Sequence, residues 1–185
     1  MTLDDVRADA FRRLADGVAD RRSPFRNPAL GTVDAAGAPS LRTVVLRGFD
    51  PDAATLWVHT DLRAAKVAEM RAEPRVSLHV WDDEAQIQVR IGGRATLHSG
   101  DARARAEWDR LHPGSRATYA VEQSSGARIG DPDALSHTSE SAAFQRLAVV
   151  DVMMLSLEWL HLAPEGQRRA RFTFGPALDA AWLVP

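Results

Sequence analysis

The chain of 185 residues contains no cysteine, and this absence excludes several kinds of site at once. Without cysteine there is no disulfide, no thiolate zinc site, no cysteine-ligated iron–sulfur cluster and no cysteine nucleophile. Apolar runs are also short, and none reaches the roughly 18 residues that a membrane-spanning helix needs. The first residues, MTLDDVRADAFRRLAD, are charged and hold no apolar signal core. We therefore expect no membrane contact, and a cytoplasmic location is the default expectation.

An excess of positive charge is missing too, because 23 Lys and Arg face 25 Asp and Glu. General nucleic-acid-binding proteins are usually strongly basic, so no nucleic-acid partner is expected. The sequence lacks the G-x-G-x-x-G, P-loop, H-E-x-x-H and G-x-S-x-G motifs, and the familiar patterns identify no catalytic residue. Six histidines occur, but no two share a helical face at metal-ligand spacing. His59, His79 and His161, which lie in predicted strands, are interpreted as structural or surface residues, and no metal site is predicted.

The hydrophobic pattern predicts a single domain over residues 1–185, with an N-terminal helix and connector over residues 1–27. Further helices are expected from Thr60 or Asp61 to Pro74, over 101–111 and over 116–123, and His112-Pro113 is interpreted as a helix stop. About seven strands are predicted. They are a hairpin in ALGTVDAAGAPSLRTVVLRGF, then TLWVHT, RVSLHVW, AQIQVRIGGRATLHS, VVDVMMLSLEWLHLA, RRARFTF and an edge strand in AAWLVP. Short connections with few helices favour a closed antiparallel barrel decorated by helices.

The most informative stretch runs from Ser40 to Lys66 and reads as strand, turn, strand and helix start. Cationic residues lie at both of its ends: Arg42, Arg47, Arg63 and Lys66. A helix start offers free N–H groups and the positive end of its dipole, so these cations together predict a phosphate cradle. The alternative is that each is an ordinary surface residue. Because Arg42 and Arg47 are an odd number of residues apart, a regular strand would point them to opposite faces. Irregularity at Gly48, or a site built at an interface, would allow them to serve one ligand.

Several segments, in this order, resemble the pyridoxamine 5′-phosphate oxidase-like family of FMN-binding split barrels. They are R-T-V-V-L-R, V-H-T-D followed by Lys66, E-P-R-V-S-L, Q-V-R-I-G-G-R-A, E-Q-S-S and a terminal W…R-R-A-R-F. The resemblance implies a mainly β protein with decorating helices, namely an antiparallel split β-barrel of the FMN-binding type. It also implies a homodimer with the FMN site at its interface and a small-molecule substrate.

The resemblance further assigns roles toward FMN, position by position. Arg42 and Lys66 match phosphate-binding residues, and Arg47 matches a lysine near the flavin and the substrate. The remaining matches are Val44 and Val45, whose backbone runs beside the ring; His59 and Thr60, which touch the cofactor; Gln88, which reaches the flavin; Gln123 and Ser124, which the second subunit donates; and Trp159 and Arg171, which lie near the ring.

The sequence departs from the family pattern in two places. The usual T-N-x-x-S-R-K becomes Thr60-Asp61-Leu62-Arg63-Ala64-Ala65-Lys66, and Arg63 is expected to compensate for the lost arginine. In the substrate-gripping R-x-H-x-R-F run, Gln167 and Arg169 replace the first arginine and the histidine. Because the cofactor half matches better, we expect an FMN-dependent oxidoreductase that transfers a hydride to or from a small molecule. The alternatives are a flavin- or phosphate-binding protein without turnover and an interaction module that binds neither.

Overall fold

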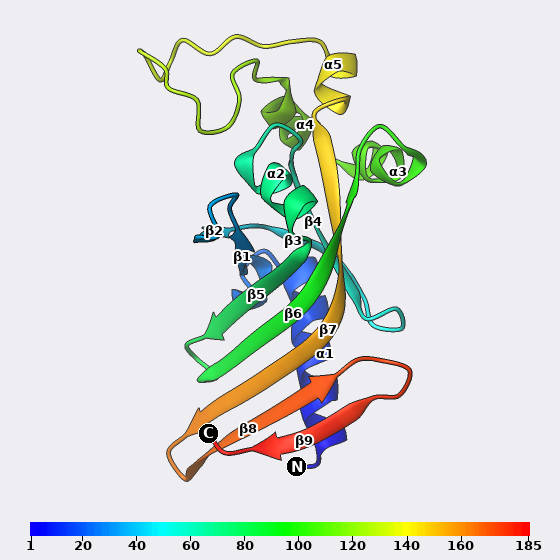
Figure 1. Cartoon of the computed structure of the whole chain (residues 1–185), viewed down its shortest axis with the longest axis vertical. Helices are drawn as coiled ribbons and strands as arrows, with labels where there is room; N and C mark the ends of the chain where they lie inside the picture. The colour runs from blue at the N-terminus through cyan, green and yellow to red at the C-terminus, as the bar shows by residue number, and fades with distance from the viewer.

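Nine strands form one antiparallel sheet in the computed structural model, which describes residues 1–185 (Figure 1). The hydrogen-bonded order is β2-β1-β5-β6-β7-β4-β3, and β8 and β9 extend the sheet from the second half of β7. The strands are β1 (Ala29–Val33), β2 (Pro39–Thr43), β3 (Leu46–Asp50), β4 (Thr55–Asp61), β5 (Arg75–Asp82), β6 (Ile87–His98), β7 (Leu147–Ala163), β8 (Gly166–Thr173) and β9 (Asp179–Leu183). The mainly β split-barrel class is confirmed.

Strand β7 organises the sheet, since its 17 residues serve two neighbours on one edge. Its first half pairs with β4, from Leu147 opposite Asp61 to Met153 opposite Thr55. Its second half pairs with β8, whereas β6 follows almost the whole of the other edge. Strands β2 and β3 remain the two ends of the path. The expectation of a closed barrel is therefore wrong, because the end strands β2 and β3 do not pair with each other.

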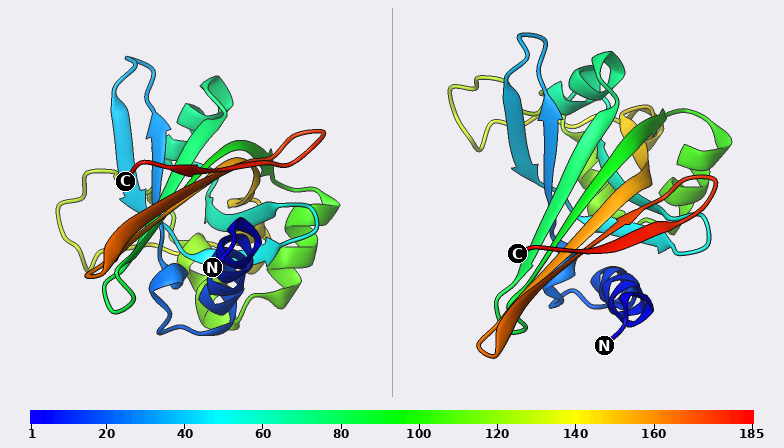
Figure 2. Two further views of the ribbon diagram at one scale, coloured as in Figure 1. Left: turned by 90° about the horizontal axis from the view of Figure 1, so that it is seen from below. Right: turned by 60° about the horizontal axis from the view of Figure 1, so that its bottom comes forward.

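Helix α1 (Leu3–Ala19) covers the inner face of the sheet, and the short helix η1 (Pro24–Arg26) follows it (Figure 2). Thr2 begins α1 with a reciprocal capping box to Asp5, which satisfies two orphan N–H groups. Val6, Ala10 and Leu14 are buried in the main core with the inward residues of the strands. The predicted N-terminal helix is confirmed.

A second, smaller core lies between the start of β7 and the helices α3 (Ala102–Arg110), α4 (Pro113–Ala120) and α5 (Glu140–Phe144). Trp108 forms its centre and meets Tyr119 and Phe144 edge-on, with ring centroids 6.0 and 5.7 Å away. The side chain of His112 caps the start of α4, with Pro113 in its first turn. The predicted helix stop is thus the beginning of the next helix, since proline is well tolerated there.

The segment from β2 to helix α2 (Ala65–Ala72) differs from the expected layout in two ways. The second half of the predicted hairpin is broken at Val44–Val45 into β2 and β3, and the register shifts again between Leu46 and Gly48. Helix α2 begins four or five residues later than predicted, because Thr60 and Asp61 pair with β7 as the end of β4. No helix of the structure has the length and apolar character required to cross a membrane.

Candidate functional site

Strand β4 divides the predicted site residues between its two faces. Leu56, Val58 and Thr60 are buried on the inner side, whereas Trp57 and His59 point the other way, toward α3. The hydroxyl of Thr60 accepts a hydrogen bond from Lys66, while His59 pairs with Glu107. The predicted His59–Thr60 pair therefore faces two environments, as the alternation of a strand requires.

The first environment is a group that we call the cationic cradle: Arg42, Thr60, Lys66 and Glu69. Lys66 is the only lysine among the 23 basic residues of the chain, and its Nζ lies 3.2 Å from Oγ1 of Thr60. It forms no ion pair with any carboxylate, although it is half-buried. Burial, followed by the charge of Arg42, lowers the pKa of Lys66 below its ordinary value. An ammonium without a counter-ion in this setting favours an incoming anion.

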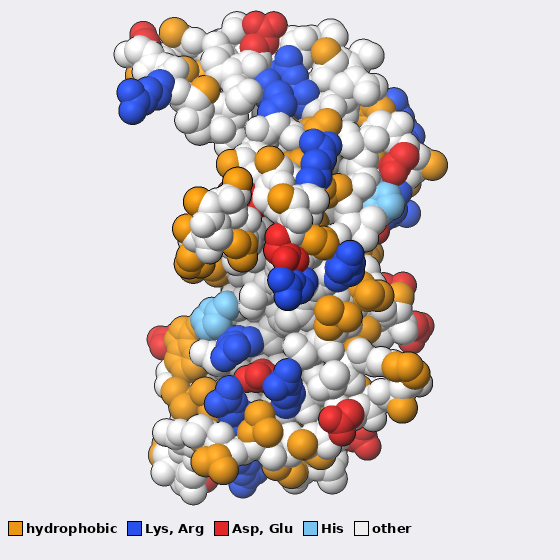
Figure 3. Space-filling model, in the orientation of Figure 1, with side chains coloured by type: hydrophobic (Ala, Val, Ile, Leu, Met, Phe, Trp, Pro, Cys, Tyr) orange, Lys and Arg blue, Asp and Glu red, His pale blue; other side chains and the backbone are white.

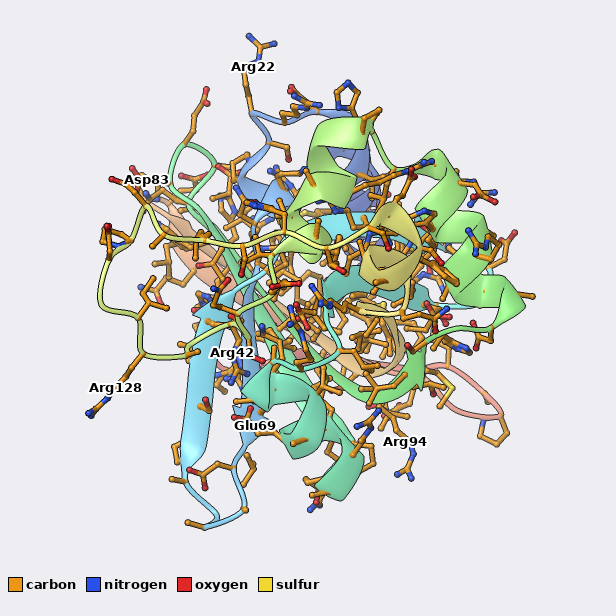
Figure 4. The ribbon with its side chains drawn as sticks, turned by 90° about the horizontal axis from the view of Figure 1, so that it is seen from above. Arg22, Arg42, Glu69, Asp83, Arg94 and Arg128 are labelled. Atoms are coloured by element: carbon orange, nitrogen blue, oxygen red, sulfur yellow. The ribbon has the colours of Figure 1, made fainter.

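Arg42 is held by partners of its own. Its Nη2 donates to Oε2 of Glu69 at 2.7 Å and to Oγ of Ser40 at 2.6 Å. Its Nη1 donates to the hydroxyl of Thr32 and to the carbonyl oxygen of Leu30. Figure 4 shows Arg42 on β2 and Glu69 on α2 reaching toward one another across the gap between these elements. The guanidinium therefore already has a carboxylate partner inside the chain.

The donor set of the cationic cradle fits a phosphate group. Two cations and the hydroxyl of Thr60 lie beside the start of α2, where free N–H groups and the helix dipole also favour an anion. Arg63 does not join them, so the expected compensation is wrong. Its guanidinium is bound to Asp61 and to the carbonyl oxygens of Val121 and Glu122, which fastens the segment after α4 to the end of β4.

The second environment is a cavity of about 250 Å³ on the other side of β4, which we call the His59 pocket. Three buried polar atoms there have no hydrogen-bond partner: Nε of Arg47, Nε1 of Trp57 and Nδ1 of His59. Buried polar groups are nearly always paired, so such a cluster indicates a place for a polar guest. The other lining residues are Val18, Arg26, Glu107, Arg110 and Leu111. Arg42 and Arg47 thus lie in separate environments, and the break between β2 and β3 does not bring them together.

Glu107 is the electrostatic hub of the His59 pocket. Its carboxylate accepts hydrogen bonds from Arg103 at 2.7 Å and Arg110 at 3.1 Å, and lies 3.1 Å from Nε2 of His59. Burial alone would raise the pKa of Glu107, but the hydrogen bond from Arg103 and the charges of His59 and Arg103 hold it below its usual value. Burial lowers the pKa of His59 to about 4, against the opposing pull of Glu107. His59 is therefore neutral at pH 7.

The outer face of β6, β7 and β8 carries Gln88, Arg90, Glu158, Arg169 and Arg171. Gln88 bonds through Oε1 to Nε2 of His79, and Arg169 donates to Glu158 at 2.6 Å. Figure 3 shows several Lys or Arg side chains gathered over the lower half of the viewed face, with an acidic group among them. Arg171 lies opposite Glu158 in the β7–β8 register and is exposed.

Trp159, Gln123 and Ser124 lie apart from that face. Trp159 points inward and is only 2% exposed, next to Val89 and Ala170. Gln123 is half-buried and Ser124 is exposed after α4, where Gln123 exchanges hydrogen bonds with Ser136 and not with the cationic cradle. Val44 is buried and Val45 is half-buried at the break between β2 and β3. One copy of the chain therefore brings Arg42, Thr60 and Lys66 together, but not the whole predicted set.

Comparison with known proteins places this geometry in a family. The model of the pyridoxamine 5′-phosphate oxidase FMN-binding domain matches residues 9–99. The chain belongs to the pyridoxamine 5′-phosphate oxidase-like family. A pyridoxine/pyridoxamine 5′-phosphate oxidase of Salinispora arenicola is 35% identical over 101 residues, which are 55% of this chain and 39% of that protein. A second such oxidase, from Arabidopsis thaliana, is 37% identical over 87 residues, or 45% of this chain and 44% of that one. The similarity thus spans less than half the length of these oxidases.

Solved structures support the fold of the pyridoxamine 5′-phosphate oxidase-like family over the whole chain. A related FMN-binding protein from Nostoc punctiforme superimposes with a TM-score of 0.79 at 22% identity, covering 100% of both chains. PhzG from Burkholderia lata, solved with tetrahydrophenazine-1-carboxylic acid, gives a TM-score of 0.76 at 18% identity, covering 98% of this chain and 92% of that one. At these identities the likeness establishes the shared fold alone.

Two acidic residues of the candidate site were missed by the sequence reading. Glu69 follows Lys66 by three residues on α2, a spacing that places both on one face of a helix. Glu107 lies on the buried side of α3 next to Trp108. The helical periodicity could have indicated Glu69. Nothing in the local pattern distinguishes Glu107 from the other charged residues of its helix.

Proposed function

We propose that this chain is an FMN-dependent oxidoreductase that binds FMN non-covalently and transfers a hydride between the flavin and a small molecule. The observation that carries the proposal is Lys66, a half-buried ammonium without a carboxylate partner beside Arg42. Membership in a family defined by an FMN-binding domain supports FMN as the anionic guest. When bound, the flavin supplies the hydride chemistry at its ring.

The residues of the chain would have distinct tasks toward that guest. Lys66 would meet the phosphate as a point charge, and the hydroxyl of Thr60 would help to orient it. Arg42 would contribute positive charge from β2, and its guanidinium is held in place by Ser40 and Thr32. The backbone at Val44–Val45, where β2 ends and β3 begins, would pass beside the ring. Each task is a binding or positioning role, since the redox chemistry belongs to the flavin.

The His59 pocket is the best candidate for the substrate. Arg47 and Arg110 line it, with the indole N–H of Trp57 also unpartnered, so it favours a small molecule with an acidic group. PhzG, which shares the fold, was solved with a carboxylic acid. Pyridoxamine 5′-phosphate itself is less favoured, because Gln167 and Arg169 stand where the family carries arginine and histidine.

We further propose that two copies of the chain form the complete site. Gln123 and Ser124 make no hydrogen bond to the cationic cradle of their own copy, and Arg171 lies on a separate face of the sheet. A two-fold pair would allow residues from both copies to reach one flavin, as the family resemblance implies. Sedimentation analysis tests this, because a dimer has twice the 20.2 kDa mass of one chain. A monomer in the presence of saturating FMN would contradict it.

The decisive experiment for the cofactor is direct. Freshly purified protein is expected to show flavin absorption, and heat is expected to release FMN that mass spectrometry identifies. If the protein purifies without a cofactor, titration with FMN should quench the flavin fluorescence at a stoichiometry of one per chain. Protein that neither carries nor takes up FMN would overturn the proposal.

The second candidate function is a flavin-binding protein without turnover of its own. The replacement of Gln167 and Arg169 in the substrate-gripping run favours it, because cofactor contacts remain where substrate contacts are lost. Anaerobic spectroscopy separates the two. An oxidoreductase should have its bound FMN reduced by NADH, by NADPH or by an oxidisable substrate. Flavin that stays oxidised with all of them would support the binding protein.

A further inference from the structure

The cationic cradle contains an acid where an anion is expected to bind. Glu69 extends from α2 to Arg42, and its Oε2 lies 2.7 Å from Nη2 of that arginine. The same oxygen accepts a hydrogen bond from the hydroxyl of Thr32. With its side chain only 10% exposed, Glu69 is fixed in this place by two partners. It is one helical turn from Lys66 and acts on it electrostatically, since its charge opposes the fall in the pKa of that lysine.

We propose that Glu69 is a built-in counter-anion that limits how tightly the cationic cradle binds a phosphate monoester. Arg42 and Lys66 contribute two positive charges, and Glu69 cancels one of them. An arriving phosphate must compete with Glu69 for the guanidinium of Arg42. It is also repelled by the negative charge of the Glu69 carboxylate. This inference rests on the proposed function, because it describes how strongly the same site holds the phosphate of FMN.

Geometry and charge can be separated by substitution. In Glu69→Gln, the amide oxygen still accepts hydrogen bonds from Arg42 and Thr32, so the arginine keeps its position while the negative charge is removed. Even with the strong dielectric screening of water, a unit charge within several ångströms of a phosphate dianion changes its affinity by roughly tenfold. We therefore expect Glu69→Gln to tighten FMN binding by about tenfold or more.

Two controls isolate the effect. Riboflavin, which lacks the phosphate, should bind the wild type and Glu69→Gln with equal affinity. Glu73→Gln removes the same charge at the end of the same helix, but Glu73 pairs with Arg75 outside the cationic cradle. That variant should bind FMN as the wild type does. Circular dichroism and thermal unfolding show whether each variant is folded.

The outcomes distinguish this inference from the proposed function. Tighter FMN binding by Glu69→Gln alone supports the counter-anion, as does FMN binding that appears only in this variant. If the wild type binds FMN and Glu69→Gln binds it equally or more weakly, the counter-anion is overturned and the proposed function stands. If no variant binds FMN, the proposed function fails. A thermal-shift assay with inorganic phosphate then tests whether Glu69 weakens anion binding. A phosphate-dependent rise in melting temperature larger in Glu69→Gln than in the wild type supports the inference, and an equal response contradicts it.

Discussion

Nε2 of His59 lies 3.1 Å from Oε2 of Glu107, and both side chains are almost fully buried, at 3% and 7% exposed. Because the carboxylate occupies Nε2, the neutral imidazole is held with its proton on that nitrogen and with an unpartnered Nδ1. Glu107 in turn depends on Arg103, which also bonds to Asp151 on β7. The pair therefore links β4 to α3 and β7 through charge as well as packing.

The first prediction concerns stability against pH. The pKa of His59 falls from 6.5 when unfolded to about 4 when folded, so the unfolded chain binds more protons between these values. The stabilisation of the folded state by neutral His59 is therefore full above pH 6.5 and is lost as the pH falls toward 4. Between pH 7.5 and pH 5, wild type should lose roughly 2 kcal/mol of unfolding free energy through this group. Urea denaturation of His59→Asn should show a loss smaller by about that amount. An equal loss in wild type and in His59→Asn would contradict this prediction.

The second prediction uses Lys66 as the only lysine of the chain. Reductive methylation with carbon-13 should give one dimethyl-lysine signal besides that of the N-terminus. Its pKa in the folded protein should lie below the ordinary 10.5 and return to it in urea, because burial and Arg42 are then removed. FMN should raise this pKa, since an opposite charge favours the protonated amine. If FMN binds but the pKa of Lys66 stays the same, Lys66 does not contact the phosphate.

The third prediction concerns the affinity for FMN. Lys66→Met removes the charge-assisted contact while keeping length and apolar bulk, so FMN should bind about 10- to 100-fold more weakly. Fluorescence titration measures this directly, and the affinity for riboflavin should not change. Arg71→Met, on the exposed side of the same helix, is the matched control and should bind FMN normally. An equal loss in both variants would point to a general charge effect.

The fourth prediction concerns the bulge in β3. A Cβ added at Gly48 would lie 1.9 Å from the Trp57 ring, so Gly48→Ala must displace the indole that borders the His59 pocket. We expect a loss of about 1–3 kcal/mol in unfolding free energy, as for other overpacked sites. Gly130→Ala places its Cβ in open space and should stay within about 0.5 kcal/mol of wild type. Equal stability of the two variants would mean that Trp57 moves without cost.

The sequence predicted the β elements well because their signal is local. Apolar β-rich runs identified the long strand now seen as β7 and its partner β8, and the N-terminal helix and the helix over 101–111 were predicted close to their observed bounds. The start of α2 was misplaced because pairing with β7 extends β4 through Asp61, and no local pattern reports that pairing. The cradle was predicted from Arg42, Arg47, Arg63 and Lys66, whereas the structure groups only Arg42 and Lys66 of these, together with Thr60. The carboxylates that complete both environments were not predicted, because Glu69 and Glu107 acquire their roles only through contacts distant in sequence.

Strand β7 has a mechanical consequence. One backbone runs through the half of the sheet that carries β4 and the half that carries β8, and no linker separates the two. Disorder of β7 itself would remove the hydrogen-bonding partner of β4, β6 and β8 at once. We therefore expect the chain to unfold cooperatively, so that the cationic cradle and the His59 pocket are lost in the same transition.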